Sequence, residues 1–147
     1  MSGIGPISGV TRLELSYVEF TAPVNVTATT EATANTIVTG GAIAYDGSTV
    51  VRIEFFAPNA NVDAGGVHDL WLVLYDGASS IGFLGIMSSL GVGYQFIPMN
   101  LSRRLTPSNA SHTYSVRAYV DYGTGNVGAG AGGVGNSMPG FIRVTKV

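Results

Sequence analysis

The stretch Leu70-Trp71-Leu72-Val73-Leu74-Tyr75, which runs directly into Asp76-Gly77, decides the fold class of this chain. Both of its faces are apolar, and the run is too short for a buried helix, which needs at least about 10–12 residues. Such a run is typical of a central strand covered on both sides. Asp-Gly then predicts a tight turn, because glycine adopts the positive φ angles that hairpins need. The stretch therefore predicts a β-rich protein built around this strand.

Further strand patterns lie on both sides of this run. Apolar and polar side chains alternate from Arg12 to Tyr17, and again from Val51 until Pro58, where we expect the strand to stop. Tyr45-Asp-Gly-Ser48 repeats the turn chemistry, and residues 59–66 are expected to form a polar loop. More strands are predicted over 24–30, 36–39, 81–87, 94–101, 113–120 and 141–147, with a loop over 103–109. No segment keeps a helical period, so we predict an all-β antiparallel sandwich or jelly roll with little or no helix.

Length and charge content set the domain organisation and the character of the surface. The chain has 147 residues, and we expect an N-terminal arm over 1–10 and one domain over 11–147. Only 11% of the residues are charged, against about 25% in ordinary soluble domains. A soluble monomer normally surrounds its core with mixed charges. We therefore expect apolar surface patches that other protein covers, in a homo-oligomer or a larger shell. Two such patches are Tyr114-Val116-Ala118 and Phe83-Ile86-Met87.

Composition also disfavours several classes of function. The chain has no cysteine, which excludes disulfide scaffolds and thiol catalysis. Its net charge is −2 and no basic run exceeds Arg103-Arg104, so nucleic-acid binding is not expected. No apolar run approaches the ~20 residues of a membrane span, and the uncharged N-terminal stretch lacks the features of a secretory signal.

Motifs for nucleotide binding and hydrolysis are weak. Gly128–Gly133 fits a GxGxxG pattern, but a strand pattern and not a helix follows it. No serine sits in a GxSxG elbow, and we interpret His68 and His112 as surface or strand-edge histidines. Glu14 and Glu54 are interpreted as outward-facing strand positions and not as a glycosidase carboxylate pair. We therefore expect no enzyme and no catalytic residue.

Metal and cofactor sites are not expected either. Asp46 and Asp76 each stand in an Asp-Gly turn, and neither belongs to the Asp-x-Asp-x-Asp cluster of a calcium loop. Turn formation is the ordinary role of such an aspartate.

Three sets of residues are candidates for contacts with partners. The glycine-rich stretch 123–140 is interpreted as a long adaptable loop, because glycine lets the backbone approach a partner closely. The candidate ligand loop combines aromatic side chains at loop edges with two asparagines of this stretch: Tyr94, Tyr119, Tyr122, Asn126 and Asn136. The candidate oligomer interface consists of Tyr114, Val116, Phe141 and Ile142, with burial in the chain's own core as the competing interpretation. In the arm, apolar contacts with the assembly are expected from Ile4, Pro6, Ile7 and Val10.

The sequence resembles a family of phage proteins over nearly everything after the arm. Leu15–Val24, Thr27–Thr33, Tyr45–Pro58, Ser102–Ser108, Ser111–Ala118 and Met138–Val144 resemble small β-sandwich modules in tail and other virion proteins of tailed bacteriophages. Such modules are similar to the trimeric jelly rolls of tumour-necrosis-factor-like and complement-like proteins. The resemblance implies a homotrimer and a scaffold, and it implies no reaction.

Together these observations predict a non-enzymatic structural protein located in the virion. The expected role is capsid decoration, in which the chain stabilises the particle by contacts with itself and with capsid or tail subunits. The alternative is a tail-associated receptor-binding knob that recognises cell-surface carbohydrate through the stretch 123–140.

Overall fold

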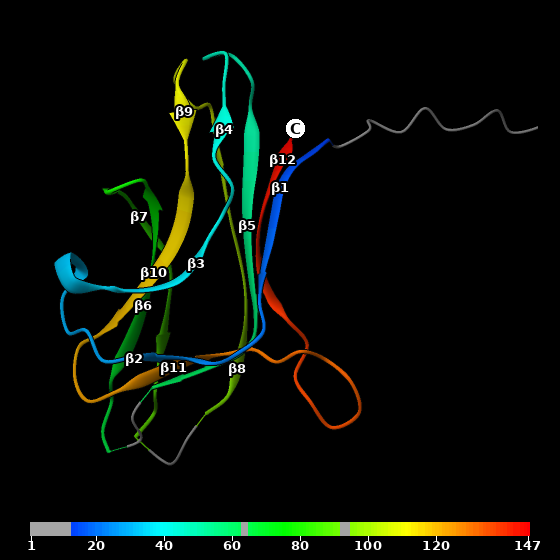
Figure 1. Ribbon diagram of the computed structural model, residues 1–147. Helices are drawn as coiled ribbons and strands as arrows, with labels where there is room; N and C mark the ends of the chain where they lie inside the picture. The colour runs from blue at the N-terminus through cyan, green and yellow to red at the C-terminus, as the bar shows by residue number, and fades with distance from the viewer. Residues whose placement is uncertain (1–12, 63–64, 92–94) are drawn as a thin grey trace, which may run out of the picture.

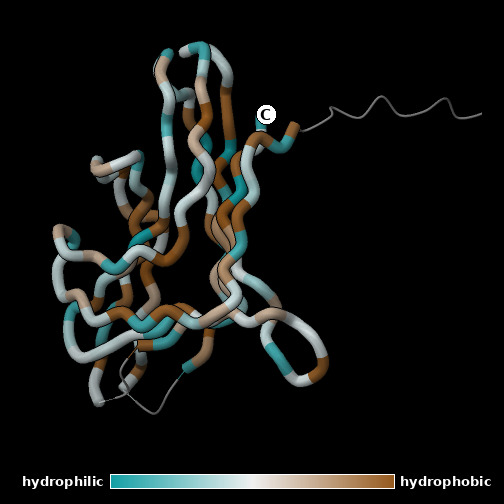
Figure 2. Tube along the Cα trace, viewed as in Figure 1, coloured by the Kyte–Doolittle hydropathy of each residue, from teal (hydrophilic) through white to brown (hydrophobic). Residues whose placement is uncertain are grey.

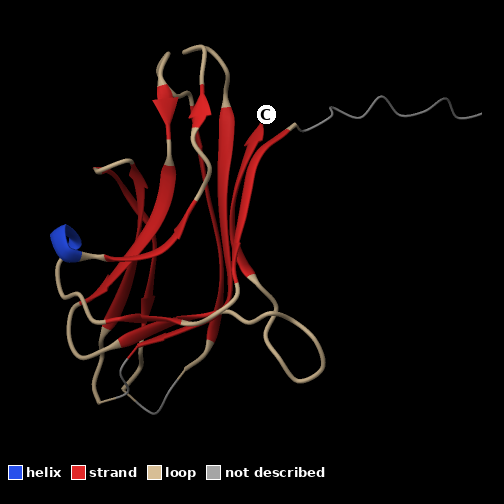
Figure 3. Ribbon diagram, in the orientation of Figure 1, coloured by secondary structure: helices blue, strands red, loops and turns tan. Residues whose placement is uncertain are grey.

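The computed structural model describes residues 13–62, 65–91 and 95–147. In this part of the chain the regular structure is β-strand apart from one short 3-10 turn, η1 (Glu31–Thr33), as Figure 3 shows. Every paired strand runs antiparallel to its neighbour. The predicted all-β class is therefore confirmed. No helix of the described residues is long and apolar enough to cross a membrane.

Two antiparallel sheets form the two layers of the molecule (Figure 1). Sheet A has the order β1 (Glu14–Phe20), β12 (Gly140–Lys146), β5 (Val51–Val62) and β8 (Ile97–Leu105). Sheet B has the order β3 (Asn35–Thr39), β10 (Tyr114–Val120), β6 (Asp69–Asp76) and β7 (Ser79–Ser88). These strand orders interleave along the chain as in a jelly roll, with connections that cross between the layers. The predicted sandwich is confirmed at this level.

Smaller strands complete the edges. Beyond the end of β12, β11 (Gly125–Gly128) pairs with the second half of β5, and β2 (Val24–Val26) pairs with β11. A separate ribbon joins β4 (Ile43–Ala44) to β9 (Ser111–His112). The Asp46-Gly47 turn therefore leads from β4 into β5 without forming a hairpin between them, because β4 pairs with β9. The turn at Asp76-Gly77 does close the predicted hairpin of β6 and β7, with Gly77 at a φ of 56°.

The core lies between the sheets and follows the alternation of the strands. In β6 the side chains of Leu70, Leu72 and Leu74 point into it and are at most 1% exposed. Phe55 of β5 faces them from sheet A and is fully buried. β6 lies between β10 and β7, so the predicted central strand is confirmed. Figure 2 shows the resulting brown segments concentrated on the strands.

The expectation that β5 stops at Pro58 is wrong, because the strand continues to Val62. On one side, the pairing with β12 ends at Phe56 and the pairing with β11 begins at Asn59. On the other side, the register with β8 shifts between Ala57 and Ala60. Pro58 therefore stands at a position where no strand on either side of β5 would accept a hydrogen bond from its backbone nitrogen, so the missing N–H costs no ladder bond. The same pairing turns residues 59–62, expected as loop, into strand, and β8 likewise extends to Leu105.

The glycine-rich stretch 123–140 is also not one continuous loop, since β11 occupies part of it. Gly128 pairs with Asn59, and a Cβ at this glycine would lie 2.0 Å from the Asn59 side-chain oxygen. The glycine thus serves close packing of two strands of the same chain.

Candidate functional site

The outward side of sheet B carries a cluster of aromatic rings. Because alternate residues of β6 point into the core, Trp71, Val73 and Tyr75 point away from it. Trp71 lies directly between Tyr119 of β10 and Ile86 of β7 in the strand register. Residues that are far apart in sequence thus meet on one outer face.

We define the aromatic face as Trp71, Phe83, Ile86 and Tyr119. The Trp71 and Tyr119 rings are parallel within 4°, with centroids 5.8 Å apart. The Phe83 centroid lies 5.0 Å from that of Trp71 and 6.5 Å from that of Tyr119. Phe83 is 55% exposed and Ile86 is 49% exposed, while the other two rings are half-buried. The result is a rigid apolar surface that remains open to a partner.

The polar groups next to the aromatic face are mostly fixed within the chain. The Arg117 guanidinium lies 4.0 Å from the centroid of the Tyr75 ring, and Nη2 donates to the Gly77 carbonyl. The Tyr75 hydroxyl donates to the carbonyl of Glu31. Burial, and then the negative charge of Glu31, raise the pKa of Tyr119, so its hydroxyl stays neutral and can donate. The face is therefore suited to an uncharged or apolar partner.

The outer face of sheet A has a different character. Arg143 Nε donates to Glu54 Oε2 at 3.0 Å, and its guanidinium lies over the Phe141 ring. Phe141 also contacts Tyr17, whose hydroxyl donates to Glu19. Charges alternate with aromatic rings here, as on an ordinary solvent-facing surface. The contrast makes sheet B the better candidate for a binding surface.

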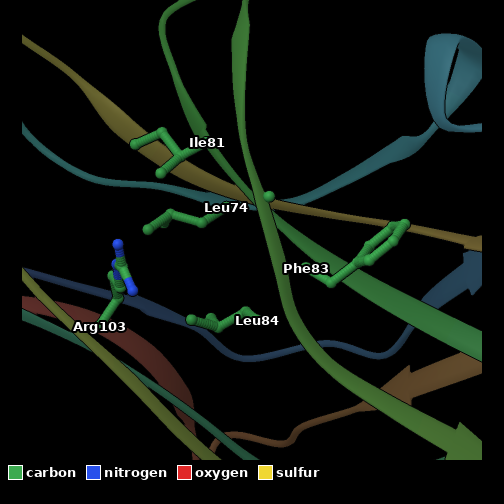
Figure 4. Close-up of a pocket in the computed structure, with 6 residues that line it drawn as sticks. Leu74, Ile81, Phe83, Leu84 and Arg103 are labelled. Carbon is green, nitrogen blue, oxygen red and sulfur yellow. The ribbon is translucent and has the colours of Figure 1, made fainter.

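A small pocket lies behind the aromatic face, at the edge formed by β7 and β8. Its volume is about 130 Å³, and its lining consists of Leu74, Ile81, Gly82, Phe83, Leu84 and Arg103. In Figure 4 the Phe83 ring points to the other side of β7 from Ile81, Leu74 and Arg103. Arg103 pairs in register with the buried Ile53, so its side chain starts toward the interior of the sandwich. An inward-pointing charge of this kind protects an edge strand from pairing with another chain.

Both histidines lie at strand ends, as interpreted, and each faces an aspartate. His68 precedes β6, with Nδ1 3.7 Å from Asp121 Oδ1, and its ring stacks on Tyr122. His112 ends β9, with Nδ1 2.5 Å from Asp76 Oδ2. Asp76 is thus the partner of an imidazole in addition to forming a turn.

Asp46 shapes the turn in which it stands. It accepts hydrogen bonds from the backbone N–H groups of Ser48 and Thr49 and from the Thr49 hydroxyl. These donors hold the pKa of its carboxyl well below the usual range. No group of three or more His, Asp or Glu side chains in the described part of the chain is arranged to hold a metal ion.

The structure does not bring the candidate ligand loop together. Tyr119 belongs to the aromatic face, whereas Tyr122 is exposed beside His68. Asn126 on β11 donates to Asn25, and the backbone of Asn136 closes a local turn with Gly133. Tyr94 lies outside the described residues. Phe83 and Ile86 belong to a predicted apolar patch, whereas Trp71 was missed because both faces of its strand were expected to be covered.

Three of the four candidate interface residues are buried in the chain's own core. Tyr114, Val116 and Ile142 are between 0% and 2% exposed, because they occupy the inward positions of β10 and β12. The expectation that they face a neighbouring chain is therefore wrong, and the competing interpretation holds for them. Phe141 points outward on sheet A and remains available. The candidate arm residues Ile4, Pro6, Ile7 and Val10 lie outside the described residues.

Comparisons with known proteins add no assignment. No protein-family model matches the chain, and a search of curated proteins finds no match. The fold and the site therefore define the protein by class: an antiparallel β-sandwich with an exposed aromatic cluster on one outer face and charges mixed with aromatic rings on the other.

Proposed function

We propose that this chain is a non-enzymatic structural protein of a bacteriophage virion, a capsid decoration protein that stabilises the particle by protein contacts. The observation that supports the proposal best is the aromatic face of sheet B, where Phe83 and Ile86 are about half exposed in a chain with few charges. Aromatic residues are enriched and charged residues depleted at the centre of protein interfaces. The virion is proposed because the sequence resembles virion modules, and the jelly-roll fold is compatible with that resemblance.

The geometry of the aromatic face suits protein binding. Trp71 and Tyr119 already pack against each other, so little rotamer freedom remains to be lost when a partner binds. Tryptophan and tyrosine are the side chains that most often dominate the binding energy of an interface. The chain would act as a homotrimer, with its arm, residues 1–10, as a second contact to the particle.

Binding to heads of the parent phage stripped of this protein tests the proposal. The variant Phe83→Ser removes the most exposed ring of the aromatic face, and we expect roughly tenfold weaker binding or more in co-sedimentation, as for an interface hot spot. The control is Phe96→Ser, which removes an exposed ring outside the aromatic face. Equal binding of Phe83→Ser and wild type contradicts a role of the aromatic face in decoration.

Deletion of residues 1–10 examines the second contact. Loss of head binding by a trimer that stays intact supports decoration. Retained binding to whole cells, with no binding to heads, supports the alternative of a receptor-binding knob.

One observation favours that alternative directly. The apolar faces of sugar rings stack on aromatic rings, whose faces carry partial negative charge, and the aromatic face offers three such rings. Trp71 is the only tryptophan of the chain, so its fluorescence reports contact at this place. A saturable change on titration with host surface polysaccharide, abolished in Phe83→Ser, supports the knob, and an unchanged spectrum argues against it.

A further inference from the structure

A second group of reactive side chains lies away from the aromatic face, where two turns and the β4–β9 ribbon meet. Asp76 ends β6, His112 ends β9, and Ser108 stands in the segment between β8 and β9. His112 Nδ1 lies 2.5 Å from Asp76 Oδ2, and His112 Nε2 lies 3.0 Å from Ser108 Oγ. The three side chains are thus linked in the order carboxylate, imidazole, hydroxyl.

The proton positions follow from the partners. An ionised carboxylate only accepts hydrogen bonds, so the proton of a neutral His112 ring resides on Nδ1. The lone pair of Nε2 is then free to accept the Ser108 hydroxyl, as in the serine–histidine–aspartate arrangement of hydrolases. Nε2 also lies 3.2 Å from the Ser108 carbonyl oxygen, a contact that becomes a hydrogen bond only when the ring is charged.

The surroundings hold the ring and expose the hydroxyl. The imidazole packs against two tyrosine rings, Tyr45 at 5.7 Å and 59° and Tyr114 at 6.1 Å and nearly parallel, and these two rings also contact each other at 6.4 Å. Its side chain is 14% exposed, whereas Ser108 is exposed. Burial, and then the charge of Asp76, raise the pKa of Tyr45 to about 12, so this neighbour stays neutral.

The backbone next to Ser108 offers one N–H group that no other group of the described chain occupies. The backbone N–H of Asn109 follows the serine, and it makes no hydrogen bond to the rest of the described chain. The residue after a nucleophilic serine supplies one such donor in known hydrolases. Because Ser108 is exposed, its hydroxyl is accessible to an ester group carried on a larger molecule.

We propose that Ser108 and His112, positioned by Asp76, form a nucleophilic site that hydrolyses short-chain acyl esters such as acetyl esters. Ser108 Oγ attacks the ester carbonyl carbon while its proton passes to His112 Nε2. That proton then goes to the alcohol oxygen as the carbon–oxygen bond of the ester breaks and the alcohol leaves. A water molecule then gives a proton to Nε2 and attacks the acyl carbon. That proton passes to Ser108 Oγ as the bond between the acyl carbon and Oγ breaks, which releases the carboxylic acid and restores the serine and the neutral imidazole. The proposed assembly role uses none of these residues, so the two proposals can be tested separately. An esterase activity would replace only the expectation that the chain is non-enzymatic.

Hydrolysis of p-nitrophenyl acetate by the full chain tests the site. We expect Ser108→Ala and His112→Gln to lose about 100-fold or more of the wild-type rate, the usual contribution of a general base and its nucleophile. Ser111→Ala is the matched control, because this exposed serine of the same ribbon makes no side-chain hydrogen bond in the described structure, and its rate should be unchanged. Asp76→Asn should lower kcat and leave KM unaltered, as expected of a positioning residue.

Labelling with a fluorophosphonate probe gives a readout that does not depend on turnover. Mass spectrometry should find the adduct on the peptide that contains Ser108 in wild type and Ser111→Ala, and not in Ser108→Ala. Ser108→Ala removes only an exposed hydroxyl, so we expect this variant to fold. It therefore tests the proposal even if His112→Gln fails to fold. Equal hydrolysis by wild type and Ser108→Ala, together with no adduct on Ser108, would overturn the proposal.

Discussion

At the scale of single residues, short polar side chains and glycines fix where the chain turns and how closely its strands approach. The Asp46 carboxylate accepts three hydrogen bonds from donors in its own turn, and the next residue, Gly47, has a φ of 78°. Gly140 leaves room for the Phe20 ring, since a Cβ at this glycine would lie 2.2 Å from a ring carbon. These residues contribute through backbone geometry and not through apolar burial.

Asp46 leads to a prediction about acid stability. Its folded-state pKa is depressed by the backbone donors of Ser48 and Thr49, so its contribution to stability is present above the unfolded pKa, near 3.8. That contribution is lost progressively as the pH falls below this value toward the folded pKa. We therefore expect Asp46→Ala to lower the urea midpoint at pH 7 and the difference from wild type to shrink below about pH 4. The control is Glu14→Gln, an exposed carboxylate on β1. A midpoint difference that is constant from pH 7 to pH 3 contradicts the prediction.

At the scale of elements, β5 is the strand of sheet A whose two halves have different neighbours on one side. β12 pairs with the first half and β11 with the second, and Pro58 stands at the change-over. The absence of a required N–H at this position explains how a long strand contains a proline.

This arrangement predicts a difference between two substitutions in the same strand. Pro58→Ala restores an N–H that no ladder uses, so we expect the free energy of unfolding to change by about 1 kcal/mol or less. Glu54→Pro removes the N–H from a residue that pairs with Ser102 on one side and Arg143 on the other. We expect it to cost about 3 kcal/mol or more. Denaturant unfolding measures both, and equal losses would show that Pro58 is not at a special place.

At the scale of the whole molecule, the sandwich divides its few charges unevenly between its outer faces. Arg143 and Glu54 form an ion pair on sheet A. On sheet B, Phe83 and Ile86 are exposed, and their register partners on β6, Val73 and Trp71, are uncharged. An uneven surface of this kind is typical of a subunit in an assembly.

The low charge content of the chain and its resemblance to trimeric modules lead us to predict a stable homotrimer. Sedimentation equilibrium at micromolar concentration should give three times the 15.2 kDa mass of one chain. The trimer contacts must come from outward residues such as Phe141, because Tyr114, Val116 and Ile142 are buried in the core of the chain. A single species of 15.2 kDa at this concentration rules the trimer out.

The sequence by itself determined the class of the fold, the central place of β6 and the turn at Asp76-Gly77, because alternation and turn chemistry are local properties. Only the tertiary structure decided which outward side chains meet. Trp71, Phe83 and Tyr119 come from three strands, and Asp76 at the end of β6 meets the segment that carries Ser108 and His112. Their meeting depends on strand order and register, which non-local pairing sets over the whole chain. The same pairing explains why Pro58 did not end its strand and why Tyr114 and Val116 were buried, since a period of two marks a face without saying what covers it.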